Sequence, residues 1–186
     1  MASAGQARIV TREDRDDAVN RLTASYQLLL DAVSGLTPEQ WNFKSAPDQW
    51  SIAECVEHIA TTEAGLLALH DRLLAMPIDT AKSAACTDQQ LSEKANDRSN
   101  KFNAPERFHP TRRWSDPKDA LKQLKEIRDQ GIAQVNSATD DLRIRFAPHP
   151  VFGDLDAFQW ICLRGGHTER HTLQIKAIQS NPAFPK

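Results

Sequence analysis

Residues 51–76 read SIAECVEHIATTEAGLLALHDRLLAM and contain the clearest helical pattern in the chain. Ser51 and Glu54 have the S-x-x-E spacing of a capping box, in which the two side chains satisfy free backbone amides at the start of a helix. The apolar residues that follow recur every three or four positions, and Pro77 then stops the pattern. The segment therefore predicts a long helix over residues 52–76 with one face turned toward a protein core.

Three other segments repeat this apolar spacing, at residues 11–34, 115–137 and 155–179. Gly35 stops the first of them, because a glycine just past a helix readily takes the conformation that ends it. The second opens with Ser-Asp-Pro, which places a capping residue before a proline at the first helical position. The chain thus predicts four long helices.

The connections between these helices differ in length. Residues 77–116 are polar, contain two prolines and support at most a short helix near 88–98, so they form a long crossover instead of a tight hairpin. Residues 144–152 form a loop or a pair of very short strands, and Gly153-Asp154 supplies a turn and a helix cap. We expect an all-α fold, a four-helix bundle in a single domain over residues 1–186, with the long crossover between its second and third helices.

Composition excludes several classes of function. The 186 residues carry a formal charge of −2, with 25 acidic against 23 basic side chains, so no basic excess is available for nucleic acid or for an anionic membrane. No stretch approaches the length of a membrane span, and residues 1–10 lack an apolar leader. The three cysteines form no C-x-x-C pair, which suits reduced thiols, and we expect a cytoplasmic protein.

Two histidines in the last predicted helix have a spacing that allows them to share a metal ion. His167 and His171 are four residues apart, so they project from neighbouring turns of one helix face. Spacing alone favours an ordinary solvated or core-edge pair. The direction of the pair is more informative, because it shares a stripe with Trp160 and Gln174 that faces the bundle interior, where an unpaired imidazole is unfavourable.

A third ligand has to come from another helix. His58 lies at the flank of the apolar stripe of the helix predicted at 52–76. A single histidine in such a place is more often a hydrogen-bonded core residue than a ligand. The residue types alone leave both interpretations open.

The local sequence around these histidines resembles a known family. Residues 50–63, WSIAECVEHIATTE, resemble the W-S-x-x-E-x-x-x-H-x-x-x-x-E stretch of the DinB-like superfamily. Residues 166–175, GHTERHTLQI, resemble its H-x-x-x-H-x-x-Q-I stretch, and Pro150-Val151-Phe152-Gly153 looks like the family's lead into its last helix. Residues 77–116 match none of the family's motifs.

The resemblance implies a four-helix bundle in up-down-down-up order that holds one divalent metal ion with three histidines. Carried onto this sequence, the ligands are His58, His167 and His171. Three neutral imidazoles leave at least one coordination position for water or substrate. Zinc is the default ion for an all-nitrogen tetrahedral site, whereas nickel, iron or manganese suit a site with five or six ligands.

The resemblance also implies a choice of functions, because the family's members include metal-dependent hydrolases and thiol-dependent transferases. We expect a protein that acts on a small-molecule substrate as a metal-dependent hydrolase, or as an S-transferase that uses a low-molecular-weight thiol. The alternative is a non-catalytic, metal-binding protein of stress response or protein interaction. The sequence assigns no catalytic residue, and an apolar helix face left open by the long crossover favours a homodimer.

Several polar residues lie near the predicted ligands. Glu54 is explained by its capping box, although it is one turn from a ligand and suits a base or an orienting group. Glu63 and His70 point into the same apolar face, which predicts a buried polar contact. Arg164 is expected at the rim of the bundle, with an anionic substrate as its other possible partner, and Gln174 is expected to pack or to donate and accept hydrogen bonds.

The remaining cysteines and histidines have simpler interpretations. Cys55 is expected to be a small apolar filler in preference to a fourth ligand or a nucleophile, and Cys86 and Cys162 are weaker candidates still. His109 and His149 fall in proline-containing loops and are expected on the surface.

Overall fold

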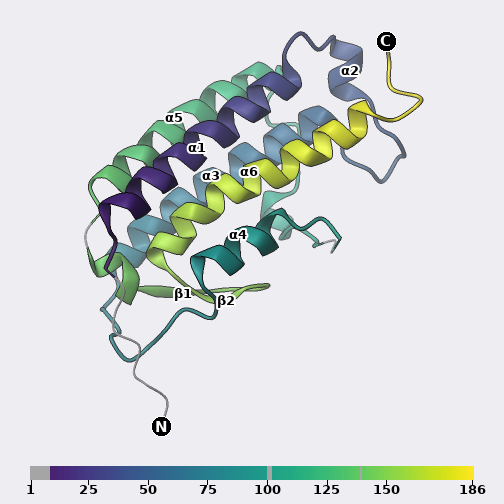
Figure 1. Ribbon diagram of the computed structural model, residues 1–186. Coiled ribbons are helices and arrows are strands. Elements are labelled where there is room, and N and C mark those ends of the chain that lie inside the picture. The colour runs from purple at the N-terminus through teal and green to yellow at the C-terminus, as the bar shows by residue number, and fades with distance from the viewer. Residues whose placement is uncertain (1–8, 100–101, 139) are drawn as a thin grey trace.

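The computed structural model confirms the predicted four-helix bundle (Figure 1) and describes residues 9–99, 102–138 and 140–186. The prediction made for residues 1–10 falls mostly on residues outside the described part. The four long helices are α1 (Arg12–Val33), α3 (Ile52–Ala75), α5 (Pro117–Asn136) and α6 (Ala157–Gln179).

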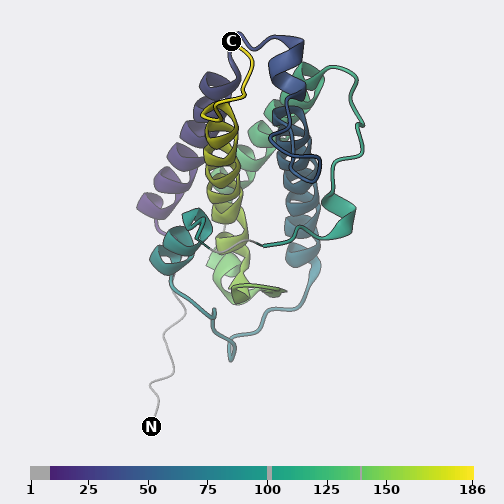
Figure 2. The ribbon, with the colours of Figure 1, turned by 90° about the vertical axis from the view of Figure 1, so that its right-hand side faces the viewer.

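The four long helices form a closed ring of contacts. α6 packs against α1 and α3, and α5 packs against α3 and α1. Helices α1 and α6 run in one direction and α3 and α5 in the other, as the side view in Figure 2 also shows. Each helix therefore places one face against two neighbours, which is what the apolar spacing in the sequence requires.

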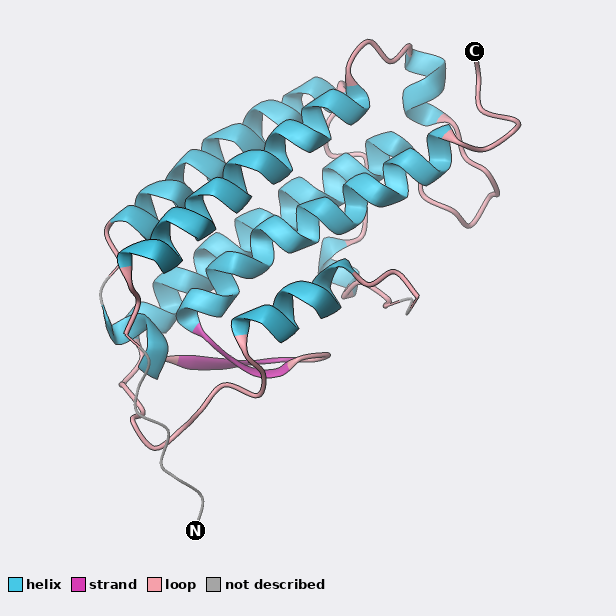
Figure 3. Ribbon diagram, in the orientation of Figure 1, coloured by secondary structure: helices cyan, strands magenta, loops and turns pink. Residues whose placement is uncertain are grey.

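Capping residues fix where the helices begin. Ser51 and Glu54 form the predicted capping box, with the Glu54 amide 3.2 Å from the Ser51 hydroxyl and the Ser51 amide 2.8 Å from the Glu54 carboxylate. Helix α3 ends at Ala75, one residue before the predicted end. Two short helices, α2 (Pro38–Asn42) and α4 (Asp88–Asn96), are coloured with the others in Figure 3.

The segment before α6 forms a pair of short strands, one of the two predicted alternatives. It forms an antiparallel hairpin of β1 (Phe146–His149) and β2 (Gly153–Asp156), preceded by a 3-10 helix, η2 (Asp140–Ile144). The predicted turn and cap at Gly153-Asp154 are wrong. The turn closes earlier, because the ring of His149 accepts hydrogen bonds from the amides of Val151 and Phe152. Asp156, two residues later than expected, caps α6.

The long crossover is attached to the bundle at two places. Helix α4 lies along α6. Arg143 joins the starts of these two helices through ion pairs with Asp88, the first residue of α4, at 2.8 Å and with Asp156, the capping residue of α6, at 2.9 Å. Further along the crossover, a second 3-10 helix, η1 (Glu106–Phe108), contacts α3. Across the described residues, no helix combines the length and the apolar character needed to cross a bilayer.

One buried arginine connects all four long helices. The Arg128 guanidinium of α5 donates to the Leu22 carbonyl at 2.6 Å and the Ser25 hydroxyl at 2.8 Å, both in α1. It also donates to the Glu63 carboxylate of α3 at 2.6 Å and to the Thr168 hydroxyl of α6 at 2.9 Å. The predicted buried contact of Glu63 is thus made to Arg128, on another helix, instead of to His70.

Candidate metal centre

The structure brings together the three histidines that the resemblance implies as ligands. His58 comes from α3, and His167 and His171 come from successive turns of α6. One nitrogen from each ring lies within 4.8 Å of the other two, so the three rings can hold a single metal ion. Among the described residues, no other group of three or more histidine, cysteine or acidic side chains has this arrangement.

Hydrogen bonds orient two of the three rings. The Nδ1–H of His58 donates to the Phe108 carbonyl at 2.8 Å, and the Nδ1–H of His171 donates to the Gln174 side-chain oxygen at 3.0 Å. These partners accept only, so they place the proton on Nδ1 and leave the Nε2 lone pair free for a metal ion. The predicted hydrogen-bonding role of Gln174 is therefore confirmed.

The facing nitrogens of His58 and His167 are spaced as a shared ion requires. Their Nε2 atoms are 3.1 Å apart. Two lone pairs at this distance repel unless a proton or a cation lies between them. Two nitrogens bound to one tetrahedral zinc ion are about 3.3 Å apart, given zinc–nitrogen distances of about 2.0–2.1 Å. The observed spacing therefore fits a shared metal ion.

Electrostatics keep the three rings uncharged. Burial lowers the pKa of His58, and repulsion from His109 adds to the effect. Burial, with repulsion from His171 and His58, lowers the pKa of His167 well below its ordinary value. Burial also lowers the pKa of His171 to about 3, again with repulsion from His58. Because a metal ion binds the neutral imidazole, the rings are in the protonation state that ligation requires at neutral pH.

An aromatic side chain covers the histidines. The Trp50 ring lies 4.8 Å from the His58 ring and 6.2 Å from the His171 ring, nearly parallel to the latter at 26°. The His109 ring lies 6.3 Å from the Trp50 ring, and it is exposed on the surface as predicted. Trp50 is the first residue of the motif at residues 50–63, yet its position over the rings was not predicted.

Glu57 holds a loop near the histidines, a structural role that was not predicted from the sequence. It is 5% exposed and accepts hydrogen bonds from the amides of Thr111 at 2.8 Å, Arg112 at 3.0 Å and Arg113 at 3.2 Å, and a fourth from the Thr111 hydroxyl. It thereby fixes the loop that follows Phe108. One signal could have revealed this role. Glu57 lies in a long buried stretch of α3, and a buried carboxylate requires hydrogen-bond or charged partners.

Two residues near the ligands have the structural roles expected of them. Glu54 completes its capping box and forms an ion pair with Lys44 at 2.8 Å. Cys55 is fully buried, and burial raises the pKa of its thiol to about 12. Cys55 is therefore a neutral apolar filler, and it is absent from the histidine group.

Two predictions about surface residues are wrong. Arg164 is 1% exposed and donates to Gln134 at 3.0 Å inside the bundle, so it does not lie at the rim. It fits there because residue 131 is glycine: a Cβ at Gly131 would lie 2.6 Å from the guanidinium. His149 is half-buried against Phe152, at 4.5 Å between ring centroids, because the hairpin folds around it.

The bundle and its histidine group agree with what comparisons with known proteins show. The chain belongs to the DinB superfamily, whose model matches residues 21–175. It is 30% identical over 148 residues to the uncharacterized protein YuaE of Bacillus subtilis, covering 79% of this chain and 88% of that one.

A solved structure shares the fold. YfiT from Bacillus subtilis, described as a probable metal-dependent hydrolase with an unusual four-helix bundle topology, superposes with a TM-score of 0.63. The alignment covers 91% of this chain and 87% of YfiT at 18% identity. At this identity the likeness shows the fold alone.

Proposed function

We propose that this protein is a metal-dependent hydrolase that holds one divalent ion, zinc by default, with His58, His167 and His171. The observation that carries the proposal is the convergence of three uncharged imidazole nitrogens within 4.8 Å of one another. When bound, such an ion acts as a Lewis acid and activates water as a nucleophile near neutral pH.

The chain's own residues support an open site. The three ligands are all imidazoles, and neither Cys55 nor a carboxylate joins them in the described structure, so a position stays free for water or substrate. The Phe108 carbonyl and Gln174 orient two rings and raise their basicity. Trp50 shields one side of the rings from solvent.

The description of YfiT as a probable metal-dependent hydrolase adds support by analogy. The two proteins share the bundle, but fold alone seldom determines a reaction. S-transfer with a low-molecular-weight thiol is the second candidate, since it uses the same open position. A non-catalytic metal-binding role is the third.

The metal site is tested by elemental analysis of untagged protein. We expect about one equivalent of divalent metal per chain in the wild type, and its loss in both His58→Ala and His171→Ala, because two nitrogens bind a divalent ion far more weakly than three. The exposed His109→Ala variant is the control and should retain the metal. A wild-type protein without metal after purification in metal-replete medium would contradict the proposal.

The reaction is tested on the loaded protein with a panel of activated esters and amides. Hydrolysis that disappears on chelation and returns with metal supports the hydrolase. Turnover that requires added glutathione, bacillithiol or mycothiol would assign S-transfer instead. A loaded protein inert in both assays would favour the non-catalytic role.

A further inference from the structure

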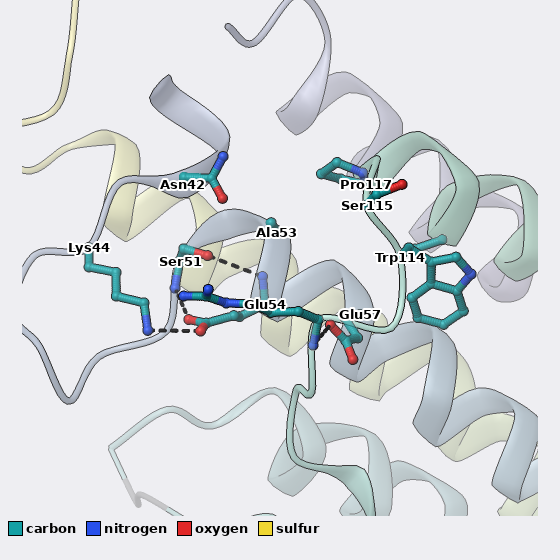
Figure 4. Close-up of a pocket in the computed structure, with 11 residues that line it drawn as sticks. Asn42, Lys44, Ser51, Ala53, Glu54, Glu57, Trp114, Ser115 and Pro117 are labelled. Carbon is teal, nitrogen blue, oxygen red and sulfur yellow. Dashed lines mark hydrogen bonds and ion pairs between the residues drawn. The ribbon is translucent and has the colours of Figure 1, made fainter. Parts of the chain in front are cut away.

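A pocket lies at the end of the bundle where α3 and α5 begin (Figure 4). Its volume is about 400 Å³, which is within the range of small-molecule sites. Residues from the first turns of α3, the segment before α5 and the end of α2 line it, and none of its lining residues is a histidine. It is therefore separate from the candidate metal centre.

One wall of the pocket contains an arginine in a strained conformation. Arg112 has φ +61°, in the left-handed region that suits glycine and is unfavourable for other residues. The loop is held in this form by Glu57, which accepts hydrogen bonds from the amides of Arg112 and of its neighbours Thr111 and Arg113. The fold thus maintains an arginine at a position where glycine is easier to accommodate.

Two basic and two acidic side chains line the pocket, and three of these four already have partners. Glu57 already accepts four hydrogen bonds, and Glu54 is paired with Lys44 at 2.8 Å and with the Ser51 amide. The exposed Arg112 guanidinium, in contrast, makes no hydrogen bond or ion pair with any residue that the structure describes. Of the charged groups that line the pocket, Arg112 is thus the one still available to bind.

The side of the pocket opposite Lys44 has a large apolar side chain. Figure 4 shows Lys44 and Trp114 on opposite sides, with Glu54 and Glu57 between them. Trp114 is half-buried, and Pro117 adds to the apolar lining on that side. A pocket lined by both an indole and a guanidinium suits a ligand that has a flat body and an anionic group.

We infer that this pocket binds a small organic anion with a flat apolar body, an aromatic carboxylate being the simplest example, through the guanidinium of Arg112. The ligand meets Trp114 with its ring, and its carboxylate accepts hydrogen bonds from Arg112. This site does not depend on the metal-dependent function, since the histidines take no part in it.

The probes are 2-naphthoate and its uncharged counterpart 2-naphthamide, added to metal-loaded protein and followed by calorimetry and by amide NMR shifts. We expect naphthoate to shift the resonances of residues 42–57 and 112–117, and naphthamide to bind at least tenfold more weakly. The informative variant is Arg112→Gly, because glycine accepts the backbone conformation of residue 112. It should not lower the urea midpoint of unfolding, yet should weaken naphthoate binding at least tenfold.

Two controls separate this site from its alternatives. Arg72→Ala removes an exposed arginine near the far end of α3 and should leave naphthoate affinity unchanged, which excludes a general charge effect. His171→Ala should also retain naphthoate binding, which excludes a carboxylate bound at the metal. Wild-type affinity in Arg112→Gly, equal affinity for naphthamide, or loss of binding in His171→Ala would each overturn the inference.

Discussion

The histidines of this protein differ in what can be inferred about them from sequence. The identity of His58, His167 and His171 as a converging set was predictable, because each lies in a recognisable motif on a regular helix. Their orientation was only half predictable. Gln174 is in a motif and three residues from His171, but the acceptor for His58 is the backbone carbonyl of Phe108, and a carbonyl leaves no signature in a sequence.

His149 shows how burial of a single ring affects stability. Burial lowers the pKa of His149 to about 4, whereas an unfolded histidine titrates at about 6.5. Below pH 6.5 the unfolded chain therefore binds a proton that the folded chain does not, so the free energy of unfolding falls as the pH falls from 6.5 to 4. For a half-buried ring we expect a loss of about 1–2 kcal/mol over this range.

The variant His149→Asn isolates this contribution. Its carboxamide oxygen can accept the same amide hydrogen bonds, and it does not titrate. Urea denaturation at pH 7, 5.5 and 4.5 should show that the variant loses less stability than the wild type as the pH falls. Parallel curves for the two proteins would show that His149 is not held neutral by the hairpin.

At the scale of elements, the sequence predicted the features that depend on residues close together in the chain, such as where each long helix begins. The helices begin where capping side chains accept from backbone amides, and these contacts join residues three apart. The β1–β2 hairpin was only half anticipated, because its turn depends on where the His149 ring lies. The position of η1 over α3 was not predicted, since it depends on contacts between residues about 50 positions apart.

Gly65 is the point at which η1 approaches α3 most closely. A Cβ at this position would lie 2.8 Å from the Phe108 ring. Alanine inside a helix normally adds about 1 kcal/mol of stability over glycine. In the otherwise wild-type protein, we expect Gly65→Ala not to raise the free energy of unfolding, because the new methyl group meets the Phe108 ring. In the Phe108→Ala background, the same substitution should raise it by about 1 kcal/mol, as measured by urea denaturation. The same effect in both backgrounds would mean that the ring moves aside without loss.

At the scale of the whole molecule, the bundle depends on a buried ion pair. Arg128 and Glu63 are each 2% exposed and contact at 2.6 Å, so removal of either partner leaves a charge in the core. We expect Glu63→Leu alone to lose about 3–5 kcal/mol. The double variant Glu63→Leu/Arg128→Met should lose much less than the sum of the two single variants, because no unpaired charge remains.

A double-mutant cycle measured by urea denaturation at pH 7 gives the coupling energy between Glu63 and Arg128. The matched control is the exposed pair of Lys125 and Asp129, which contact at 2.7 Å on one helix face. That cycle should give roughly 0.5 kcal/mol or less. Equal coupling in the two cycles would show that burial of the Arg128 pair does not strengthen it.

The loop held by Glu57 has a consequence for motion. Glu57 and His58 are adjacent in α3, and both form hydrogen bonds with the segment from Phe108 to Arg113. The amides of this segment should therefore exchange with deuterated solvent as one unit, each time the loop lifts from the helix. The same lifting removes the acceptor that orients His58, so we expect the opening equilibrium of a surface loop to determine the fraction of time for which the three rings of the candidate metal centre are aligned.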